Sequence, residues 1–576
     1  MNMTHLLKSV WFASVWVGVT LIFADHSLAY AGGEPVLELQ VTANGQPLKM
    51  NQVTQLVDKQ NRQVGVSRLD LLLSDFSLQR TDGTWTEAAR PWHGFFRAEQ
   101  PTMRQALPQL PPGNYIAARF AVGVNRQENH GDPNRLRPDD PLHPVVNGMH
   151  WGWKGGYVFV ALEGHWQFDH APAGTTGGYS YHLGGDSNRV VITLPGKLSV
   201  TSGTVLHLNL DASKLLSRID IAKDGDSTHS REGDPLVGLL KGSLTRSFTL
   251  QALGTAAKPG KITPAYRDVS SAKEHYPMAI GVHMPSVALP QDNIPTIQGV
   301  ALGRLLFQDK RLSRDGRVSC SSCHRAGYAL SDAGQAVSTG IAGQKGVRNA
   351  MPIFNLAWVN EFFWDGRAKS LRLQALEPIQ HPKEMAAALP QVVKKLASDR
   401  AMVERFEQAF GGAITADRIG LALEQFMLTV VAQDSKFDQA QKGGRQLSNI
   451  EKRGLELFLT EHDPAKGLFG ADCFHCHGGA LFTNQRFVNN GLRLSSRDIG
   501  REQVTGDPAD RGKFRVPSLR NVAVTGPYMH DGRFKSLEAV IDHYDHGIDR
   551  SATLDPNIAK HPKAGLRLST EDKAAL

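Results

Sequence analysis

Cysteine is scarce in this chain: there are four among 576 residues, and all lie in the second half. The first half has none, so disulfides cannot brace it. Blocks of like charge are also absent, and a net charge of +8 from scattered Lys and Arg does not indicate a nucleic-acid surface. Hydrophobic residues at 41% and charged residues at 21% exclude a disordered, collagen-like or coiled-coil chain. The length allows about four domains.

No apolar run is long enough to span a bilayer. The run Val10 to Phe23 has 14 residues, whereas a spanning helix needs about 18 or more. Lys8 precedes it and Ala29-Tyr30-Ala31 follows it, which is typical of a secretory signal peptide at 1–31. An uncleaved anchor is the alternative. We therefore expect a mature periplasmic protein without a membrane span.

The sequence after the signal peptide predicts an all-β sandwich over residues 32–255. Val36 to Val41 alternates in polarity and leads into the turn dipeptide Asn44-Gly45, and residues 206–210 alternate in the same way. Many short strands separated by Gly and Pro favour a sandwich or barrel. Residues 256–289 lack periodicity and are interpreted as a linker. Further strands are expected at 115–124 and 157–162.

The sequence after the linker is helical in pattern and repeats itself. CSSCH at 320–324 has a counterpart in CFHCH at 473–477, and DGRAKSL at 365–371 has one in DGRFKSL at 531–537. Ser448 and Glu451 form a capping box that opens a helix. We therefore predict a mostly α domain of two duplicated lobes, 290–447 and 448–576.

The two CxxCH motifs are the signature of covalent haem c attachment. The thiols of Cys320, Cys323, Cys473 and Cys476 would bind two haems, and His324 and His477 would ligate the irons. CxxC alone also occurs in zinc and redox sites, but here all four cysteines fall in the two motifs. We interpret His475, inside the second motif, as a surface residue and not as a ligand.

The repeat also predicts different coordination at the two haems. The position seven residues after the last Leu of each DGRxKSL segment is Pro378 in the first copy and Tyr544 in the second. Proline has no donor atom, whereas a phenolate can ligate ferric iron, so we expect an open first haem and a second capped by Tyr544. Met529 and His543 are competing ligands, and Tyr544 has the alternative of an ordinary core tyrosine.

The region from residue 290 onwards resembles the bacterial diheme cytochrome c peroxidase family. The resemblance rests on residues 302–303, 309, 312–313, 315–316, 320–324, 363–367, 374–375, 378, 384–385, 517–521 and 527–532. Conventional members carry a distal His after the first CxxCH and a Met in place of Tyr544. Both are absent here, so the chain is most similar to the MauG and MbnH branch. That family usually continues beyond the position of Leu576.

The resemblance implies specific roles for several residues. Glu384 would be the acid–base group on the distal side of the first haem. Gln374 would form a hydrogen bond in the same pocket, and Pro378 would line that pocket. Trp364 would lie between the haems and help to share the oxidising equivalents of a high-valent diheme state. A calcium ion between the lobes is also implied, at positions matched by Asn349, Thr525 and Pro527.

The first half resembles MbnP, an exported copper-binding protein in which a diheme partner oxidises a tryptophan to kynurenine. The resemblance rests on residues 71–76, 82–85, 129–132, 149–157, 163–164 and 181–184. It implies copper binding by His130, His150 and His182, since imidazoles suit copper. Trp151 and Trp153 are the expected oxidation targets, with Trp92 as an outsider. Each of these side chains has the alternative of an ordinary surface or core residue.

Three functions are consistent with these features. The first is a diheme enzyme that uses hydrogen peroxide to oxidise a tryptophan of its own or a partner's β domain and so builds a copper site. The second is a conventional peroxidase supplied with electrons by a small cytochrome or cupredoxin. The third is a non-enzymatic electron-transfer and copper-binding protein. Modification of a β-domain tryptophan after peroxide treatment separates the first from the others.

Overall fold

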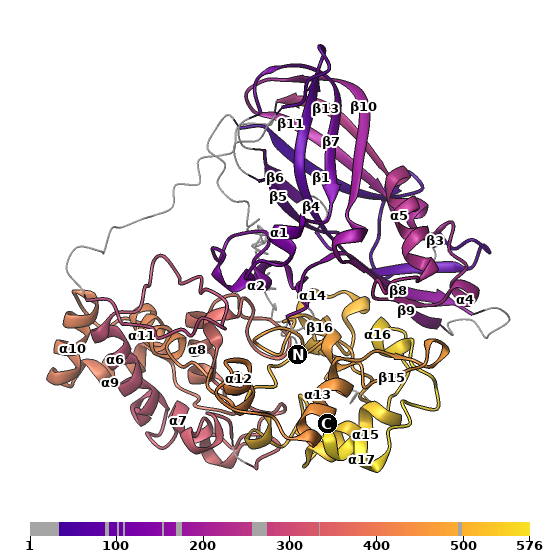
Figure 1. Cartoon of the computed structure of the whole chain (residues 1–576). Coiled ribbons are helices and arrows are strands. Elements are labelled where there is room, and N and C mark those ends of the chain that lie inside the picture. The colour runs from indigo at the N-terminus through magenta and orange to yellow at the C-terminus, as the bar shows by residue number, and fades with distance from the viewer. Residues whose placement is uncertain are drawn as a thin grey trace, which may run out of the picture.

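A β-sheet domain and a helical domain lie against each other in the computed structural model (Figure 1). The structure describes residues 34–53, 55–86, 91–100, 103–107, 110–152, 155–168, 176–255, 274–332, 334–493 and 498–576. The expected signal peptide, Trp153 and much of the expected linker lie outside these residues. Among the described helices, none is both long and apolar enough to cross a membrane. The predicted order of a β domain followed by a helical domain is confirmed.

Two packed sheets form the β domain. The smaller has the order β13-β11-β1-β2, with β6 also on β1, and the larger has the order β10-β7-β4-β8-β9-β12, with β3 and β5 also on β4. The pairs β1–β11 and β9–β12 are parallel and the others are antiparallel. The strands are β1 Val36–Ala43, β2 Gln46–Pro47, β3 Leu56–Val57, β4 Gln63–Arg80, β5 His93–Arg97, β6 Met103–Ala106, β7 Gly113–Val122, β8 Val158–Gln167, β9 Thr176–Gly184, β10 Val190–Val200, β11 Thr204–Asp211, β12 Ser227–Thr228 and β13 Phe248–Thr255.

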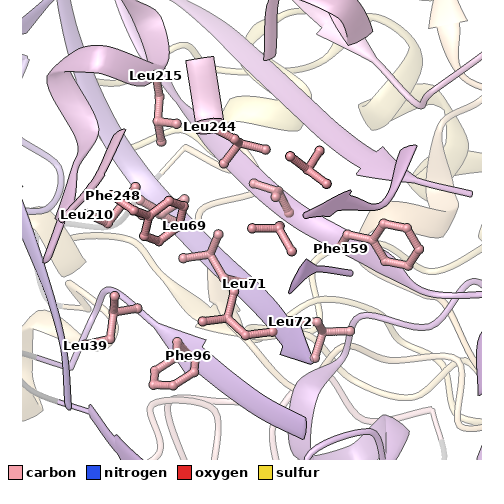
Figure 2. Close-up of a cluster of buried hydrophobic side chains, with 14 of the residues drawn as sticks. Leu39, Leu69, Leu71, Leu72, Phe96, Phe159, Leu210, Leu215, Leu244 and Phe248 are labelled. Carbon is pink, nitrogen blue, oxygen red and sulfur yellow. The ribbon is translucent and has the colours of Figure 1, made fainter. Parts of the chain in front are cut away.

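The central strand β4 is buried on both faces, which explains its long apolar sequence. Leu69 and Leu71 point into the core between the sheets, where Phe96 and Phe248 also lie (Figure 2). Because side chains alternate along a strand, Arg68 and Asp70 take the opposite face. Both are buried there, where Asp70 meets the helical domain.

The β domain contains helices that the predicted all-β pattern did not include. The longest, α5 (Pro235–Ser247), begins with Pro235 and is capped by the Asp234 side chain, which accepts from the Leu236 amide. Leu244 of this helix covers one side of the core (Figure 2). The others are α1 Arg126–Asn129, α2 Pro144–Asn147, α3 Ala212–Leu216 and α4 Ile221–Asp224.

The helical domain has two lobes. In the first, α6 packs closely on α11 because Gly303 has no side chain, and a Cβ there would lie 1.9 Å from the Ala422 carbonyl oxygen. In the second, Ser448 and Glu451 form the predicted capping box at the start of α13. The first-lobe helices are α6 Ile297–Gln308, α7 Cys320–Cys323, α8 Leu371–Gln380, α9 Leu389–Ala397, α10 Arg400–Phe410, α11 Ala416–Leu428 and α12 Lys436–Gln441. The second-lobe helices are α13 Asn449–Leu459, α14 Glu502–Thr505, α15 Leu537–His546, α16 Pro556–Ala559 and α17 Thr570–Ala575, with short strands β14 His462–Asp463, β15 Leu468–Phe469, β16 Phe487–Val488 and β17 Phe514–Arg515.

The backbone repeats in the two lobes, as the sequence repeat predicted. A bridge joins Phe362 to Ala368 in the first lobe, and another joins Tyr528 to Phe534 in the second. Each bridge is followed by a helix with a serine cap, α8 and α15. Pro378 and Tyr544 occupy the eighth position of these helices, so the two residues are structural counterparts.

The β domain docks on the second lobe through buried polar contacts. Arg486 Nη1 donates to Asp70 Oδ2 at 3.2 Å, Asn557 Nδ2 donates to Glu163 Oε2 at 3.0 Å, and His165 Nε2 donates to the Leu554 carbonyl at 2.8 Å. Of these, the Asn557–Glu163 contact joins α16 to β8, and α16 also packs on β9 (Figure 1). The two domains are thus held in one orientation by polar contacts that are buried or mostly buried.

Candidate functional site

The first CxxCH motif presents its histidine in a form suited to a metal. Cys320 and Cys323 lie at the two ends of α7, and His324 follows directly. His324 Nδ1 donates to the Leu330 carbonyl at 2.9 Å, so Nε2 keeps a free lone pair. Burial lowers the pKa of His324, and the imidazole is therefore neutral. Two thiols and one free ring nitrogen are the donors that haem c attachment needs.

A cavity of about 920 Å³ adjoins His324. It is lined by the four residues to which the resemblance assigned catalytic roles: Trp364, Gln374, Pro378 and Glu384. Gln374 and Pro378 come from α8, and Glu384 lies just beyond its end. The structure thus brings these side chains together from three separate segments of the first lobe.

Close backbone packing positions Glu384. The Ile341 amide donates to the Glu384 carbonyl at 2.7 Å, and a Cβ at Gly340 would lie 2.2 Å from the Lys383 carbonyl oxygen, so only glycine allows this approach. Burial raises the pKa of Glu384, although His381 and Arg367 lower it in part. Its Oε1 lies 3.4 Å from His381 Nδ1. A carboxyl group whose pKa is raised towards neutrality is suited to both accept and return a proton.

The second CxxCH motif has the same histidine arrangement. His477 Nδ1 donates to the Phe482 carbonyl at 3.2 Å, and burial lowers the pKa of His477 to about 4. Asn490 Nδ2 lies 3.1 Å from the hydroxyl of the expected ligand Tyr544 and 3.4 Å from Sδ of its competitor Met529, so the two side chains lie near one another. His543 instead directs Nε2 to the Asn490 carbonyl at 3.0 Å. Burial raises the pKa of Tyr544, with the two attachment cysteines nearby.

Trp364 lies where the lobes meet. Its Nε1 donates to the Asn349 carbonyl at 2.9 Å, and the Arg515 amide of the second lobe donates to the Trp364 carbonyl at 2.8 Å. Asn349 is also close to the segment that contains Pro527, because its amide donates to the His530 carbonyl at 2.7 Å. The Asn349 side chain donates to carbonyls of the first lobe, and Thr525 Oγ1 donates to the Val522 carbonyl. Asn349 therefore lies near the segment of the other two expected calcium ligands, and calcium binding at these residues stays a prediction.

The three histidines expected to bind copper do not lie in one cluster. His130 is exposed and contacts Asp186 Oδ2 at 3.0 Å. The half-buried His150 packs its ring on Tyr157 at 4.7 Å and lines the same small cavity as His182. His182 instead meets His229 and His475, whose ring nitrogens all lie within 4.8 Å of one another. The interpretation of His475 as a surface residue was wrong, because only 3% of its side chain is exposed. The histidine inside CFHCH was the available signal for it, whereas nothing in the sequence marked His229.

Trp151 lies beside this cluster, at the junction of the domains. Its ring centre is 6.2 Å from that of His229, and it lines a cavity of about 100 Å³ together with Phe474 and His475 of the second CxxCH motif. A Cβ at Gly152 would lie 3.4 Å from the Cα of Gly479, so the two loops pack backbone against backbone. The expected oxidation target Trp151 thus faces the same small cavity as the attachment segment of the second haem, and the neighbouring Gly152 packs on that segment.

A duplicated helical domain with two CxxCH motifs, each with a neutral histidine poised to ligate iron, defines a dihaem c-type cytochrome. The acid-bearing pocket beside the first motif adds the features of a peroxidase. The chain belongs to the di-haem cytochrome c peroxidase family, in the group that includes MauG, and it carries an MbnP domain in front. The family profile matches residues 297–446, and the MbnP profile matches residues 32–230. Membership implies an oxidoreductase with two haem c groups that acts on hydrogen peroxide.

The similarity to characterised proteins covers the helical half. The methylamine utilization protein MauG of Methylorubrum extorquens is 38% identical over 47% of this chain and 74% of its own length. The cytochrome c551 peroxidase of Nitrosomonas europaea is 38% identical over 42% of this chain and 71% of its own length. A crystal structure of a MauG-like protein associated with microbial copper homeostasis is 33% identical, covering 52% of this chain and 93% of that one, with a TM-score of 0.47.

Proposed function

We propose that this protein is an exported dihaem oxidoreductase that uses hydrogen peroxide to oxidise Trp151 of its own β domain towards kynurenine, preparing a copper site. One observation carries the proposal: the loop that holds Trp151 packs on the second haem-attachment segment, beside Phe474 and His475. A substrate residue in permanent contact with the redox domain needs no diffusional encounter.

The residues around the first cavity have different roles in peroxide activation. When bound, the haems supply the redox chemistry. Glu384 takes the proton of one peroxide oxygen and returns it to the other, and its raised pKa supports both transfers. Gln374 orients peroxide by a hydrogen bond, and Pro378 offers no donor that would compete for the iron.

Trp151 does not line the first cavity. Electrons must therefore travel from Trp151 to this cavity through groups that lie between them. Trp364, held at the junction of the lobes, is a suitable intermediate station. The segment from Cys473 to His477 links the second haem to the interface with Trp151. In the overall reaction, two peroxide molecules are reduced to water at the first cavity and supply four oxidising equivalents, and two water molecules beside Trp151 supply the two oxygen atoms that open the indole ring to N-formylkynurenine. Hydrolysis then releases formate and leaves kynurenine.

Peptide mass spectrometry after peroxide treatment tests the proposal. We expect Trp151 to gain two oxygen atoms and then to lose its formyl group, and Trp151→Phe to remove this product. Trp166→Phe is the control, since Trp166 is also buried in the β domain but contacts Phe168 and Arg62. The proposal fails if the peptide with Trp151 keeps its original mass while peroxide is consumed.

A further inference from the structure

Three imidazoles from both domains converge on one buried point. His182 lies on β9, His229 follows β12, and His475 lies between the cysteines of the second CxxCH motif. His229 Nε2 is 3.0 Å from His182 Nδ1 and 2.7 Å from His475 Nε2. The three side chains are 5%, 6% and 3% exposed, so water does not separate them.

Each ring turns its other nitrogen to a buried carboxylate. His182 Nε2 lies 2.9 Å from Glu163 Oε1, His229 Nδ1 lies 2.9 Å from Glu461 Oε2, and His475 Nδ1 lies 2.7 Å from Asp472 Oδ1. These acids are ionised. Burial acts to raise their pKa values, but the charges of Arg68 at Glu163 and of Lys560 at Glu461 and Asp472 hold them low.

The carboxylates decide where the ring protons lie. A neutral imidazole has one N–H, and an ionised carboxylate can only accept, so the proton belongs on the nitrogen that faces the acid. The three nitrogens that face one another then carry lone pairs alone. One extra proton can join two lone pairs but not three, whereas a metal ion accepts all three. Metal-binding histidines are commonly paired with carboxylates in this way, and the His182–Glu163 pair is already aligned as a hydrogen bond of 2.9 Å.

We propose that His182, His229 and His475 form a metal site shared between the domains, for a late first-row transition-metal ion. Three neutral imidazoles without thiolate or ligating carboxylate suit Cu²⁺ and Zn²⁺, and the general order of stability places Cu²⁺ above Zn²⁺. A tetrahedral ion with bonds of ~2.0 Å holds its ligand atoms ~3.3 Å apart, so the observed spacing needs only small side-chain shifts. His182 and His475 also line the 100 Å³ cavity, which has room for a fourth, water-sized ligand.

The site has a consequence for the whole molecule. Two ligands belong to the β domain and the third to the haem-attachment segment, so a bound ion ties the domains together. The set differs from His130, His150 and His182, the residues expected from the sequence. It does not require oxidation of Trp151, because all three ligands are unmodified histidines.

Zinc titration of the full-length, haem-loaded protein tests the site. Chelator-treated protein that has never met peroxide is titrated with Zn²⁺ alone in a calorimeter, since Zn²⁺ is redox-inert towards haem. We expect one ion per chain, and one equivalent of Cu²⁺ should displace it. His475→Ala should weaken binding more than tenfold, and Asp472→Asn by about 10–100-fold. His130→Ala, which removes an exposed histidine, should bind as the wild type does.

The readout of domain coupling is thermal unfolding with and without Zn²⁺. Ligands that bind only the folded state raise the melting temperature, so Zn²⁺ should stabilise the wild type and not His475→Ala. His475→Ala keeps both cysteines and His477, and its two haems serve as the check on folding. If His475→Ala lacks a haem, Asp472→Asn is used in its place as the test variant. Absence of a stoichiometric Zn²⁺ site, or equal affinity in the wild type and these variants, overturns the proposal. Trp151→Phe should still bind Zn²⁺, which separates this site from tryptophan oxidation.

Discussion

Replacing Glu384 by glutamine probes the chemistry of the first cavity most directly. The amide keeps the size of the side chain, and Cys320, Cys323 and His324 are untouched, so both haems should remain attached. A positioned acid–base contributes about 10²–10⁴-fold in rate. That range corresponds to ~3–5 kcal/mol of activation free energy, at ~1.4 kcal/mol for each factor of ten.

The pH dependence gives a second, independent prediction for Glu384. Burial raises the pKa of this carboxyl, so its protonated form persists to higher pH than in an ordinary glutamate, for which the value is 4.5. Only the ionised form can take a proton from peroxide. The rate of the reaction with peroxide should therefore fall as the pH drops through the raised pKa of Glu384. Glu384→Gln should not show this fall.

Stopped-flow absorption after mixing with peroxide measures both effects. Glu377→Gln is the matched control, because Glu377 also lines the cavity but pairs with Arg367 at 2.9 Å. We expect it to react within about threefold of the wild type, as usual for a surface ion pair. An unchanged rate in Glu384→Gln, or an equal loss in both variants, would refute the acid–base role.

Two other predictions concern the second haem and the contact between lobes. If Tyr544 ligates the second haem, Tyr544→Phe should change its ferric absorption spectrum and Met529→Leu should not; the opposite pattern would assign the ligand to Met529. Arg520→Met should lower the free energy of unfolding by ~3–5 kcal/mol, because the buried Asp438 loses its arginine partner. Two hydrogen bonds of 2.8 and 2.9 Å are lost with it. Arg533→Met, at a more exposed pair, should cost less than ~1 kcal/mol in denaturant titrations. Burial acts to raise the pKa of Asp438, but Arg520 holds it below 3.8, so this stabilisation is present above about pH 4 and lost on acidification. If the free energy of unfolding of Arg520→Met fell as steeply on acidification as that of the wild type, this account would be contradicted.

Much of the fold could be predicted from local patterns. The alternation at Val36–Val41 and at 206–210 lies in β1 and β11, and the capping box at Ser448 opens α13. Helix α5 was missed because the all-β pattern was extended over the whole of residues 32–255. Its role is to cover the core, and burial of this kind depends on the sheet beneath it.

Some residues of the candidate sites could likewise be predicted from the sequence, and others could not. The sequence repeat paired Pro378 with Tyr544, and the structure places them at equivalent helix positions. The position of His475 could not be predicted, because its burial depends on a domain more than 200 residues earlier in the chain. His229 likewise has no motif of its own.

The sequence by itself determined the covalent chemistry: four cysteines in two CxxCH motifs, two adjacent histidines, and a duplicated helical domain. A CxxCH motif depends on residues a few positions apart in the chain, so the sequence alone specifies its local geometry. Only the tertiary structure decided which β-domain residues meet the second haem segment. The contact of Trp151 and the histidine cluster with residues 473–479 arises from docking of two separately folded surfaces, and buried polar pairs such as Arg486 with Asp70 set their orientation.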